Sequence, residues 1–325
     1  MGTERDILIL LSTYNGERFL PAQLESVRTQ TIADRIHIVI RDDGSTDSTV
    51  SLIESMDMAP LSIEVVRGEN LGALDSFSTL ICGADPSYPT IMLCDQDDVW
   101  MPDKAEIAAQ ALAGASLPTL YCGRSITTDD DLNPTGVTSG APQGPYFRNS
   151  LFQNIAPGHT MAFNQALADL YRRTINPYIL MHDWWLYCLA AGVGTVIFDP
   201  VPHTYYRLHS SNEIGYATSW VSTFVRDVKR LVTEDRSALT WRAEALWELV
   251  GPELSDENRA MLKAFVDQKT FASRWAYIRR YPMVTQNPRP PWTSTLLFLL
   301  GWYRKRRPSE PQTQVVSPKA KEADL

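Results

Sequence analysis

Three acidic side chains gather in the short stretch DQDD at residues 95–98, which directly follows an apolar run at 91–94. Carboxylates this close repel one another unless water, hydrogen bonds or a cation offset their charge. Hard divalent cations such as Mg²⁺ and Mn²⁺ prefer oxygen ligands, so the stretch could hold a metal that bridges to a diphosphate. It could equally be an exposed acidic turn that caps a helix starting near Pro102. These four residues alone leave the two interpretations even.

Two further polar turns follow apolar runs, STYNG at 12–16 and DDGS at 42–45. A carboxylate beside an aromatic ring such as Tyr14 can grip a pyrimidine base, because the ring packs on the base and the acid accepts its N–H. Taken alone, the turn at 42–45 is more often a helix cap. Neither a Gly-x-Gly-x-x-Gly fingerprint nor a Walker-type Gly-Lys-Ser/Thr is present, which argues against dinucleotide binding and ATP hydrolysis.

The elements that must position these turns alternate along the chain. We predict strands at 7–11, 36–40, 61–66 and 91–94, separated by helices at 17–30, 49–56 and 73–82. Such alternation predicts an α/β fold with a doubly wound, mostly parallel central sheet flanked by helices. Ligands bind at the carboxyl ends of such strands, so the turns after the first, second and fourth strands should meet at one edge. That coincidence favours a ligand site over separate caps.

The later pattern is a helix at 102–113, a strand at 119–122 and a long, plausibly mobile loop at 129–146. A strand at 158–163, helices at 166–173 and 182–191, a strand at 193–198 and an extended segment at 205–209 follow. Residues 219–280 have a helical pattern. We therefore expect a catalytic domain at 1–215, a helical extension at 216–307 and a disordered tail at 308–325.

Composition narrows the class of protein. The 325 residues are 44% hydrophobic and 21% charged, as in an ordinary folded protein, and the net charge of −8 argues against broad nucleic-acid binding. The four cysteines are scattered without a CxxC pair, so neither a zinc site nor a disulfide framework is indicated. No signal peptide and no apolar run of about 18–20 residues is evident, which predicts a cytoplasmic protein.

Near the C-terminus, the apolar segment WTSTLLFLLGWY at 292–303 is followed at once by four cations at 304–307. Twelve residues are too few to span a bilayer but suffice for an interfacial helix. We expect residues 292–307 to hold the protein on the anionic inner face of the cytoplasmic membrane. The alternative is a helix docked on the protein itself, with a solvated basic tail.

Four segments carry a resemblance in order and spacing: STYNG at 12–16, DDGSTD at 42–47, NLG at 70–72 and DQDD at 95–98. Over about residues 6–215 the chain resembles the family-2 glycosyltransferases of the GT-A fold. The segments HDWW at 182–185 and YRLHSSN at 206–212 resemble the rhamnosyltransferase-like branch of bacterial cell-surface polysaccharide synthesis.

The resemblance implies roles for individual residues. Asp95 and Asp97 match the Asp-X-Asp motif that holds Mg²⁺ or Mn²⁺ and the sugar diphosphate, while Asp98 could cap the next helix or support the site from outside. Asp183 matches the inverting catalytic base, although this chain has His182 where most of the family has Glu. The implied nucleotide-sugar residues are Ser12, Tyr14, Asp43, Asn70, Gly72 and Gln96.

Five other residues have both a functional and a structural interpretation. His209 could be a further metal ligand and Arg207 could meet the diphosphate, or both could be structural. His159 could line the acceptor pocket or be a satisfied structural histidine. Trp184 and Trp185 could offer a sugar-stacking face, but adjacent helical residues point apart, so we expect one in the core and one at the pocket.

The implied activity is inverting, metal-dependent transfer of a sugar to a hydroxyl of a lipid-linked glycan or cell-surface polysaccharide. dTDP-rhamnose is the favoured donor and a UDP-hexose the second. A nucleotidyltransferase would instead need a Gly-rich, basic phosphate-binding loop after the first strand, and residues 12–16 contain no basic side chain. A non-catalytic sugar-binding protein would not need Asp95, Asp97 and Asp183 together.

Overall fold

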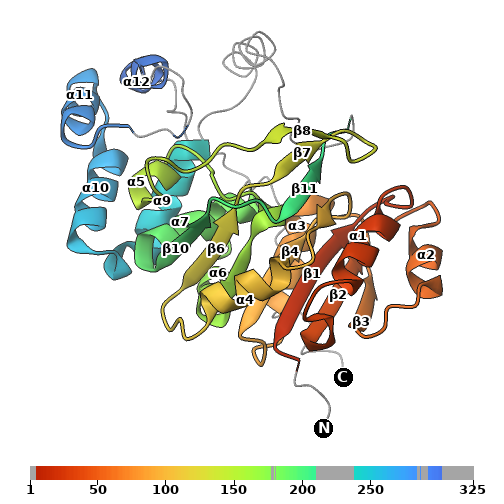
Figure 1. Ribbon diagram of the computed structural model, residues 1–325. Helices are drawn as coiled ribbons and strands as arrows, with labels where there is room; N and C mark the ends of the chain where they lie inside the picture. The colour runs from red at the N-terminus through yellow and green to blue at the C-terminus, as the bar shows by residue number, and fades with distance from the viewer. Residues whose placement is uncertain are drawn as a thin grey trace.

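The computed structural model describes residues 5–176, 179, 181–209, 238–283, 286 and 292–301. Its centre is a seven-stranded sheet in the order β10-β6-β9-β4-β1-β2-β3, flanked by helices (Figure 1). All pairings in this sheet are parallel except the two made by β9. The predicted α/β fold is therefore confirmed. The strands are β1 (Ile7–Thr13), β2 (Ile36–Asp42), β3 (Ser62–Arg67), β4 (Thr90–Cys94), β6 (Thr119–Gly123), β9 (Ala162–Asn164) and β10 (Thr195–Asp199).

Strand β1 shows why the sheet has helices on both faces. Its side chains from Ile7 to Leu11 are all buried, and they divide by the two-residue period of a strand between two cores. Leu8 and Leu10 join the core formed with α3 (Gly72–Gly83), α6 (Gln165–Thr174) and α7 (His182–Val193). Ile7, Ile9 and Leu11 join the core formed with α1 (Leu20–Arg28), α2 (Thr49–Ser55) and α4 (Lys104–Leu112). A strand buried on both faces reads as a continuous apolar run, which is why this one was predictable.

A second, four-stranded sheet in the order β5-β11-β7-β8 stands at the carboxyl end of β4. Its strands are β5 (Val99–Trp100), β7 (Ile126–Thr128), β8 (Pro134–Val137) and β11 (Thr204–Arg207). The prediction of a structureless loop over 129–146 is wrong at β8, which pairs with β7. All four side chains of β8 are exposed, so no apolar pattern marked it as a strand.

Further helices add residues to the core that contains Leu8 and Leu10. They are α5 (Phe147–Ser150), α9 (Ala238–Val250), α10 (Asp256–Asp267), α11 (Phe271–Arg280) and α12 (Trp292–Leu299). Single-turn 3₁₀ segments lie at Ala33–Arg35, Gly158–Thr160 and Gly251–Glu253. Leu246 of α9, Phe265 of α10 and Phe298 of α12 share the core of Leu8 and Leu10.

Helix α12 docks on the protein through Phe298 and Leu299, which are buried, while Leu296 and Leu300 are exposed. Within the described ranges, no helix is both long and apolar enough to cross a membrane. The predicted disordered tail, the cations at 304–307 and the segment 210–237 lie outside the described residues.

Candidate active site

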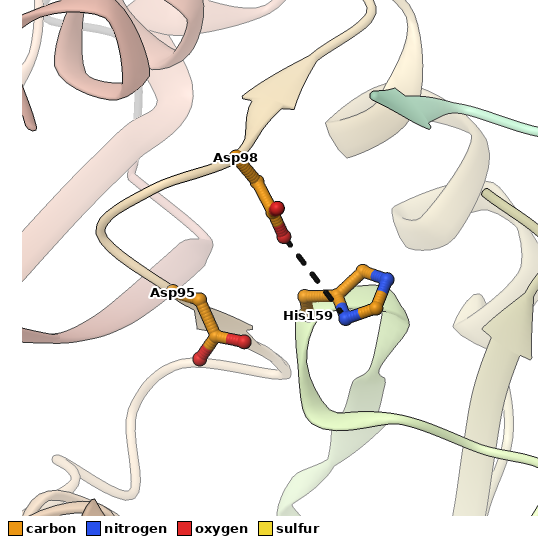
Figure 2. A group of neighbouring side chains, drawn as sticks. All are labelled: Asp95, Asp98 and His159. Atoms are coloured by element: carbon orange, nitrogen blue, oxygen red, sulfur yellow. Dashed lines mark ion pairs between the residues drawn. The ribbon is translucent and has the colours of Figure 1, made fainter. Parts of the chain in front are cut away.

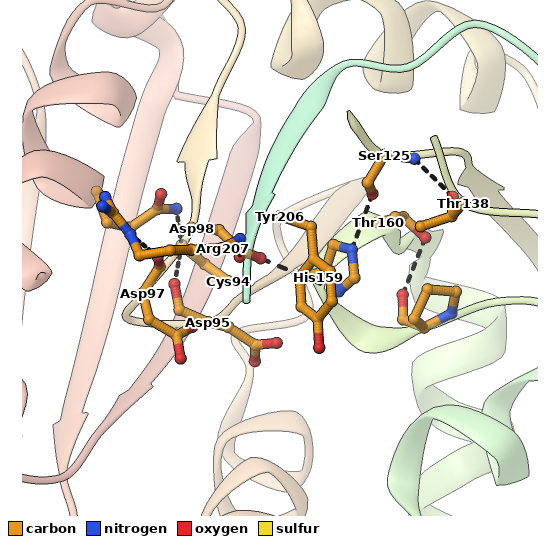
Figure 3. A network of polar contacts seen from close by, with 12 residues as sticks. Cys94, Asp95, Asp97, Asp98, Ser125, Thr138, His159, Thr160, Tyr206 and Arg207 are labelled. Carbon is orange, nitrogen blue, oxygen red and sulfur yellow. Dashed lines mark hydrogen bonds and ion pairs between the residues drawn. The ribbon is translucent and has the colours of Figure 1, made fainter. Parts of the chain in front are cut away.

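The acidic turn 95–98 joins β4 to β5, and β11 brings two basic side chains to it. Strand β11 pairs antiparallel with β5, which brings Arg207 at its end, and His209 two residues further on, to the acids. His209 Nε2 lies 2.8 Å from Asp97 Oδ2. The backbone N–H of Arg207 donates to Asp98 Oδ1 (3.2 Å), and its Nε donates to the carbonyl of Asp97 (2.9 Å) (Figure 3). Asp97 and His209 thus meet as predicted, and Arg207 fixes the backbone of the turn.

A second group at this edge consists of Asp95, Asp98 and His159, whose potential ligand atoms lie within 4.8 Å of one another (Figure 2). Asp98 is fully buried, its Oδ2 has no hydrogen-bond partner, and that atom is 4.0 Å from Nδ1 of His159. Burial, then the charges of Asp97 and Asp95, raise the pKa of Asp98 well above its usual value. A cation among these groups would offset the buried charge and satisfy the unpaired oxygen, so the donor set fits a divalent metal.

His159 is held firmly in this group. Its ring stacks on Tyr206 at 4.5 Å with an interplanar angle of 3°, and its Nε2 is 2.8 Å from Ser125 Oγ. Lys104 donates from Nζ to the carbonyl of His159 (2.6 Å). Burial and the charge of Lys104 lower the pKa of His159 to about 3, so its imidazole is neutral at pH 7. Neutral imidazole is the form that binds metals. The structure places His159 beside the acids of the 95–98 turn, whereas the sequence had suggested an acceptor-pocket or a structural role.

Asp43 is almost fully buried and its carboxylate is already in use. It accepts from the Arg41 guanidinium and from the backbone N–H groups of Leu71 (2.9 Å) and Gly72 (2.8 Å). The side chain therefore ties the segment 70–72, with exposed Asn70, to the end of β2. The neighbouring Asp42 is also buried, and its Oδ1 has no hydrogen-bond partner. Of these two adjacent aspartates, Asp42 is thus the one with an acceptor atom to spare, a distinction that the sequence does not reveal.

The turn after β1 is braced by Gln96. Its Oε1 accepts from Thr13 Oγ1 (2.6 Å) and from the backbone N–H of Tyr14 (2.9 Å), and its Nε2 donates to the carbonyl of Tyr14 (3.1 Å). Ser12 Oγ lies 2.6 Å from Ser76 Oγ. The Tyr14 side chain is 45% exposed. These bonds hold the β1 turn against the acidic turn and leave the tyrosine ring open to a ligand.

Asp183 lies in the first turn of α7, where the unpaired N–H groups of a helix favour a carboxylate. Its Oδ1 accepts from the backbone N–H of Trp184 (2.6 Å) and its Oδ2 from Asn154 Nδ2 (2.9 Å). Burial raises the pKa of Asp183 to about 6, although these bonds, one from the backbone of Gly158, and the charge of Arg242 oppose the shift. A carboxylate with such a pKa is ionised at pH 7 yet basic enough to accept a proton.

The Gly158–His159 dipeptide links the two halves of the site. Gly158 hydrogen-bonds to Asp183, while His159 lies beside Asp98. A Cβ at position 158 would stand 3.2 Å from Nε2 of His182, so the close approach favours glycine. Residues from β4, β11 and α7, far apart in the chain, are thereby brought into one region.

The paired tryptophans point apart, as expected. Trp185 is 1% exposed and lies in the core, where its Nε1 donates to Thr174 Oγ1 (3.2 Å). Trp184 is partly buried next to Asp183, and its Nε1 donates to the carbonyl of Ser150 (2.7 Å). Trp184 is therefore the partly exposed tryptophan beside Asp183, and Trp185 belongs to the core.

Comparisons with known proteins agree with this geometry. The family model described as "Glycosyl transferase family 2" matches residues 8–176. The chain is 30% identical over 235 residues to dTDP-rhamnosyl transferase RfbG of Shigella flexneri, an alignment that covers 66% of this chain and 77% of that protein. It is 24% identical over 183 residues to UDP-Glc:alpha-D-GlcNAc-diphosphoundecaprenol beta-1,3-glucosyltransferase WfgD of Escherichia coli, covering 56% of this chain and 68% of that protein.

Among solved structures, residues 1–349 of S. aureus TarS in complex with UDP-GlcNAc match with a TM-score of 0.52 and 14% sequence identity. The match covers 92% of this chain and 89% of that one. A likeness at this identity shows a shared fold, here that of a GT-A transferase.

Proposed function

This chain belongs to glycosyl transferase family 2, and we propose that it transfers a sugar from a nucleotide-sugar donor by an inverting, metal-dependent mechanism. The observation that carries the proposal is the joining of two groups of side chains through Gly158–His159. One group consists of Asp95, buried Asp98 and the neutral imidazole of His159, and the other is the Asp183 carboxylate, whose pKa is about 6.

The metal would be Mg²⁺ or Mn²⁺, held by carboxylates of the 95–98 turn together with histidine. Asp95, Asp97 and His209 are one candidate set, and Asp98 with His159 extends it on the buried side. Such an ion, when bound, supplies Lewis-acid stabilisation of the charge on the leaving diphosphate. Asp98 Oδ2 supports the assignment, because a buried carboxylate oxygen without a partner is costly unless a cation or proton meets it.

Asp183 acts as the general base in this proposal. One of its oxygens takes the proton of the acceptor hydroxyl while the hydroxyl oxygen attacks the anomeric carbon. The bond from that carbon to the diphosphate oxygen breaks in the same displacement, so the configuration inverts and no covalent sugar–enzyme intermediate forms. Hydrogen bonds from Asn154, Gly158 and Trp184 orient the Asp183 carboxylate. They also stabilise its ionised form, because they oppose the rise in its pKa that burial causes.

The donor we favour is dTDP-rhamnose, with a UDP-hexose second, because RfbG is a dTDP-rhamnosyl transferase by name. Tyr14 would pack on the base, Ser12 would contact the nucleoside, and the segment 70–72 held by Asp43 would border it. Asp42 Oδ1 supports a role in accepting the imide N–H of a pyrimidine. We also assign Arg207 to the diphosphate, because it borders the acidic turn through its bond to the carbonyl of Asp97.

The acceptor we favour is a lipid-linked glycan or growing polysaccharide, on the inner face of the cytoplasmic membrane. Exposed Phe271 and Trp275 of α11, exposed Leu296 of α12 and exposed Leu300 directly after it support an interfacial surface on this part of the protein. Trp275→Ala combined with Leu296→Ala should lower binding to vesicles containing anionic lipid, measured by flotation. Unchanged flotation would contradict membrane docking by these helices.

A panel of nucleotide-sugars, tested for thermal stabilisation with and without Mn²⁺ or Mg²⁺, tests the central proposal. We expect a metal-dependent rise in melting temperature with dTDP-rhamnose or a UDP-hexose, because a ligand that binds only the folded state stabilises it. Asp97→Asn should abolish the metal-dependent part. No metal-dependent shift with any donor would refute the proposed mechanism.

A further inference from the structure

The C-terminal helix α9 sends one arginine toward Asp183. Arg242 is 8% exposed, and its guanidinium carbon lies 3.5 Å from the centroid of the Trp184 ring. Figure 1 shows α9 beside α5 and α7, the helix that carries Asp183 and Trp184. An arginine stacked on an aromatic ring keeps its edge available for hydrogen bonds, because the ring occupies only its face.

Two donors on that edge are unpaired. Nε and Nη2 of Arg242 are buried and have no hydrogen-bond partner. These nitrogens form one side of the guanidinium, and their N–H groups point the same way, in the geometry that meets two oxygens of a carboxylate or phosphate at once. Leaving charged donors buried and unpaired costs folding free energy. A bound oxyanion would remove this cost by accepting hydrogen bonds from Nε and Nη2 of Arg242.

The groups around Arg242 do not supply that oxyanion. Asp183 is the neighbouring carboxylate and its charge acts on Arg242, yet its oxygens accept from Trp184 N–H and Asn154 and not from Nε or Nη2. Cys188 also lies near Arg242, but burial raises the pKa of its thiol, which stays protonated at pH 7 and donates from Sγ to the carbonyl of Ser150 (3.4 Å). Burial lowers the pKa of Arg242 to about 10, so the guanidinium is still charged at pH 7.

We propose that Arg242 binds an oxyanion of the acceptor, either a phosphate or a sugar carboxylate, through the Nε and Nη2 edge while Trp184 supports its face. This rests on the proposed function, since Asp183 as the base places the acceptor beside it. The helical extension then contributes to acceptor choice as well as to the core. Neutral acceptors would leave the two donors unpaired and bind less well.

The test follows the Nε–Hε signal of Arg242 by NMR in the full chain labelled with ¹⁵N-arginine, in EDTA and at constant ionic strength. The signal is identified by its loss in Arg242→Lys. We expect titration with inorganic phosphate, with acetate, or with both to shift it saturably. A shift with phosphate alone indicates a phosphorylated acceptor, and one with acetate alone indicates an acidic sugar. Saturable shifts with both support an oxyanion site that accepts either group.

Arg279→Met, at an exposed arginine of α11, is the matched control and should leave the Arg242 titration unchanged. Absence of saturation with both anions overturns the proposal. So does an Arg242 signal that responds to Asp183→Asn but to neither anion, because the arginine would then serve only as an ion partner of Asp183. If Asp183→Asn retains full turnover, the proposed base fails, whereas anion binding at Arg242 is measured independently of it.

Discussion

Replacing Asp183 by Asn should abolish turnover and, at neutral and alkaline pH, relieve a cost to the fold. Burial raises the pKa of this carboxyl to about 6 from its usual 3.8. The folded protein therefore holds the proton more tightly than the unfolded chain does, and ionisation destabilises the fold. The cost is absent below about pH 4, grows as the pH rises to about 6, and is constant above that.

These two pKa values fix the size of the effect. Linkage predicts a cost of about 2 kcal/mol at pH 5 and about 3 kcal/mol at pH 8 for the ionised carboxyl. Asn resembles the protonated form, so the free energy of unfolding of Asp183→Asn relative to the native protein should rise by about 1 kcal/mol between pH 5 and pH 8. The variant could also lose stability because its new amide faces the Asn154 amide. That loss does not depend on pH, so it cancels when values at different pH are compared.

Nearby groups do not obscure the measurement. Burial lowers the pKa of His182 to about 4, so this ring is neutral throughout the window, and Arg242 is charged throughout it. Urea unfolding of both proteins at pH 5, 6, 7 and 8 gives the comparison. A difference that stays constant or falls with rising pH would refute the raised pKa.

The same variant tests the chemistry. Loss of the base should lower turnover by about 100- to 10,000-fold while donor affinity changes little. In the native enzyme, kcat/KM should rise with pH through about 6 and then level off, because the base acts in its ionised form. Retained turnover in Asp183→Asn would remove this residue from the base role.

Three other substitutions separate packing, metal binding and site geometry. Trp185→Ala should lower the free energy of unfolding by about 3–5 kcal/mol in urea, because this ring fills the core; a loss under about 1 kcal/mol would contradict its placement. Asp98→Asn should weaken Mn²⁺ binding at least about tenfold by calorimetry, and unchanged affinity would exclude it from the metal set. Gly158→Ala should lower kcat with donor affinity retained, since its Cβ would press on Nε2 of His182; unaltered kcat would show that the dipeptide tolerates the shift.

The sequence predicted the parallel half of the fold well for a physical reason. β1, β2 and β4 are mostly buried and apolar, and each is followed by a polar turn. Because βαβ units make these strands parallel, the turns at their carboxyl ends lie at one edge of the sheet. β5 and β8 escaped prediction because β5 has two residues and β8 is exposed along its whole length. No local pattern distinguishes such strands from loops, because they exist only through pairing with distant partners.

Within the candidate site, residue types were easier to predict than their partners. Gln96 stood in a motif associated with the donor, and its amide instead bonds to Thr13 and Tyr14 across the turn after β1. Arg242 lies in a segment whose sequence shows only a helical pattern with interleaved charges, so nothing marked it as a neighbour of Asp183. Its unpaired donors became visible only in three dimensions.

Asp98 shows most clearly where local spacing stops being informative. The family resemblance favoured Asp95 and Asp97 over Asp98, because these two residues match the Asp-X-Asp motif. The direction of each side chain, however, depends on β5, which starts immediately after Asp98 and pairs with β11. That pairing brings the Arg207 N–H to Asp98 and Tyr206 against His159, so that Asp98 turns inward to the histidine. Because β11 lies about a hundred residues further along the chain, no argument from the four residues of the turn could have assigned that direction.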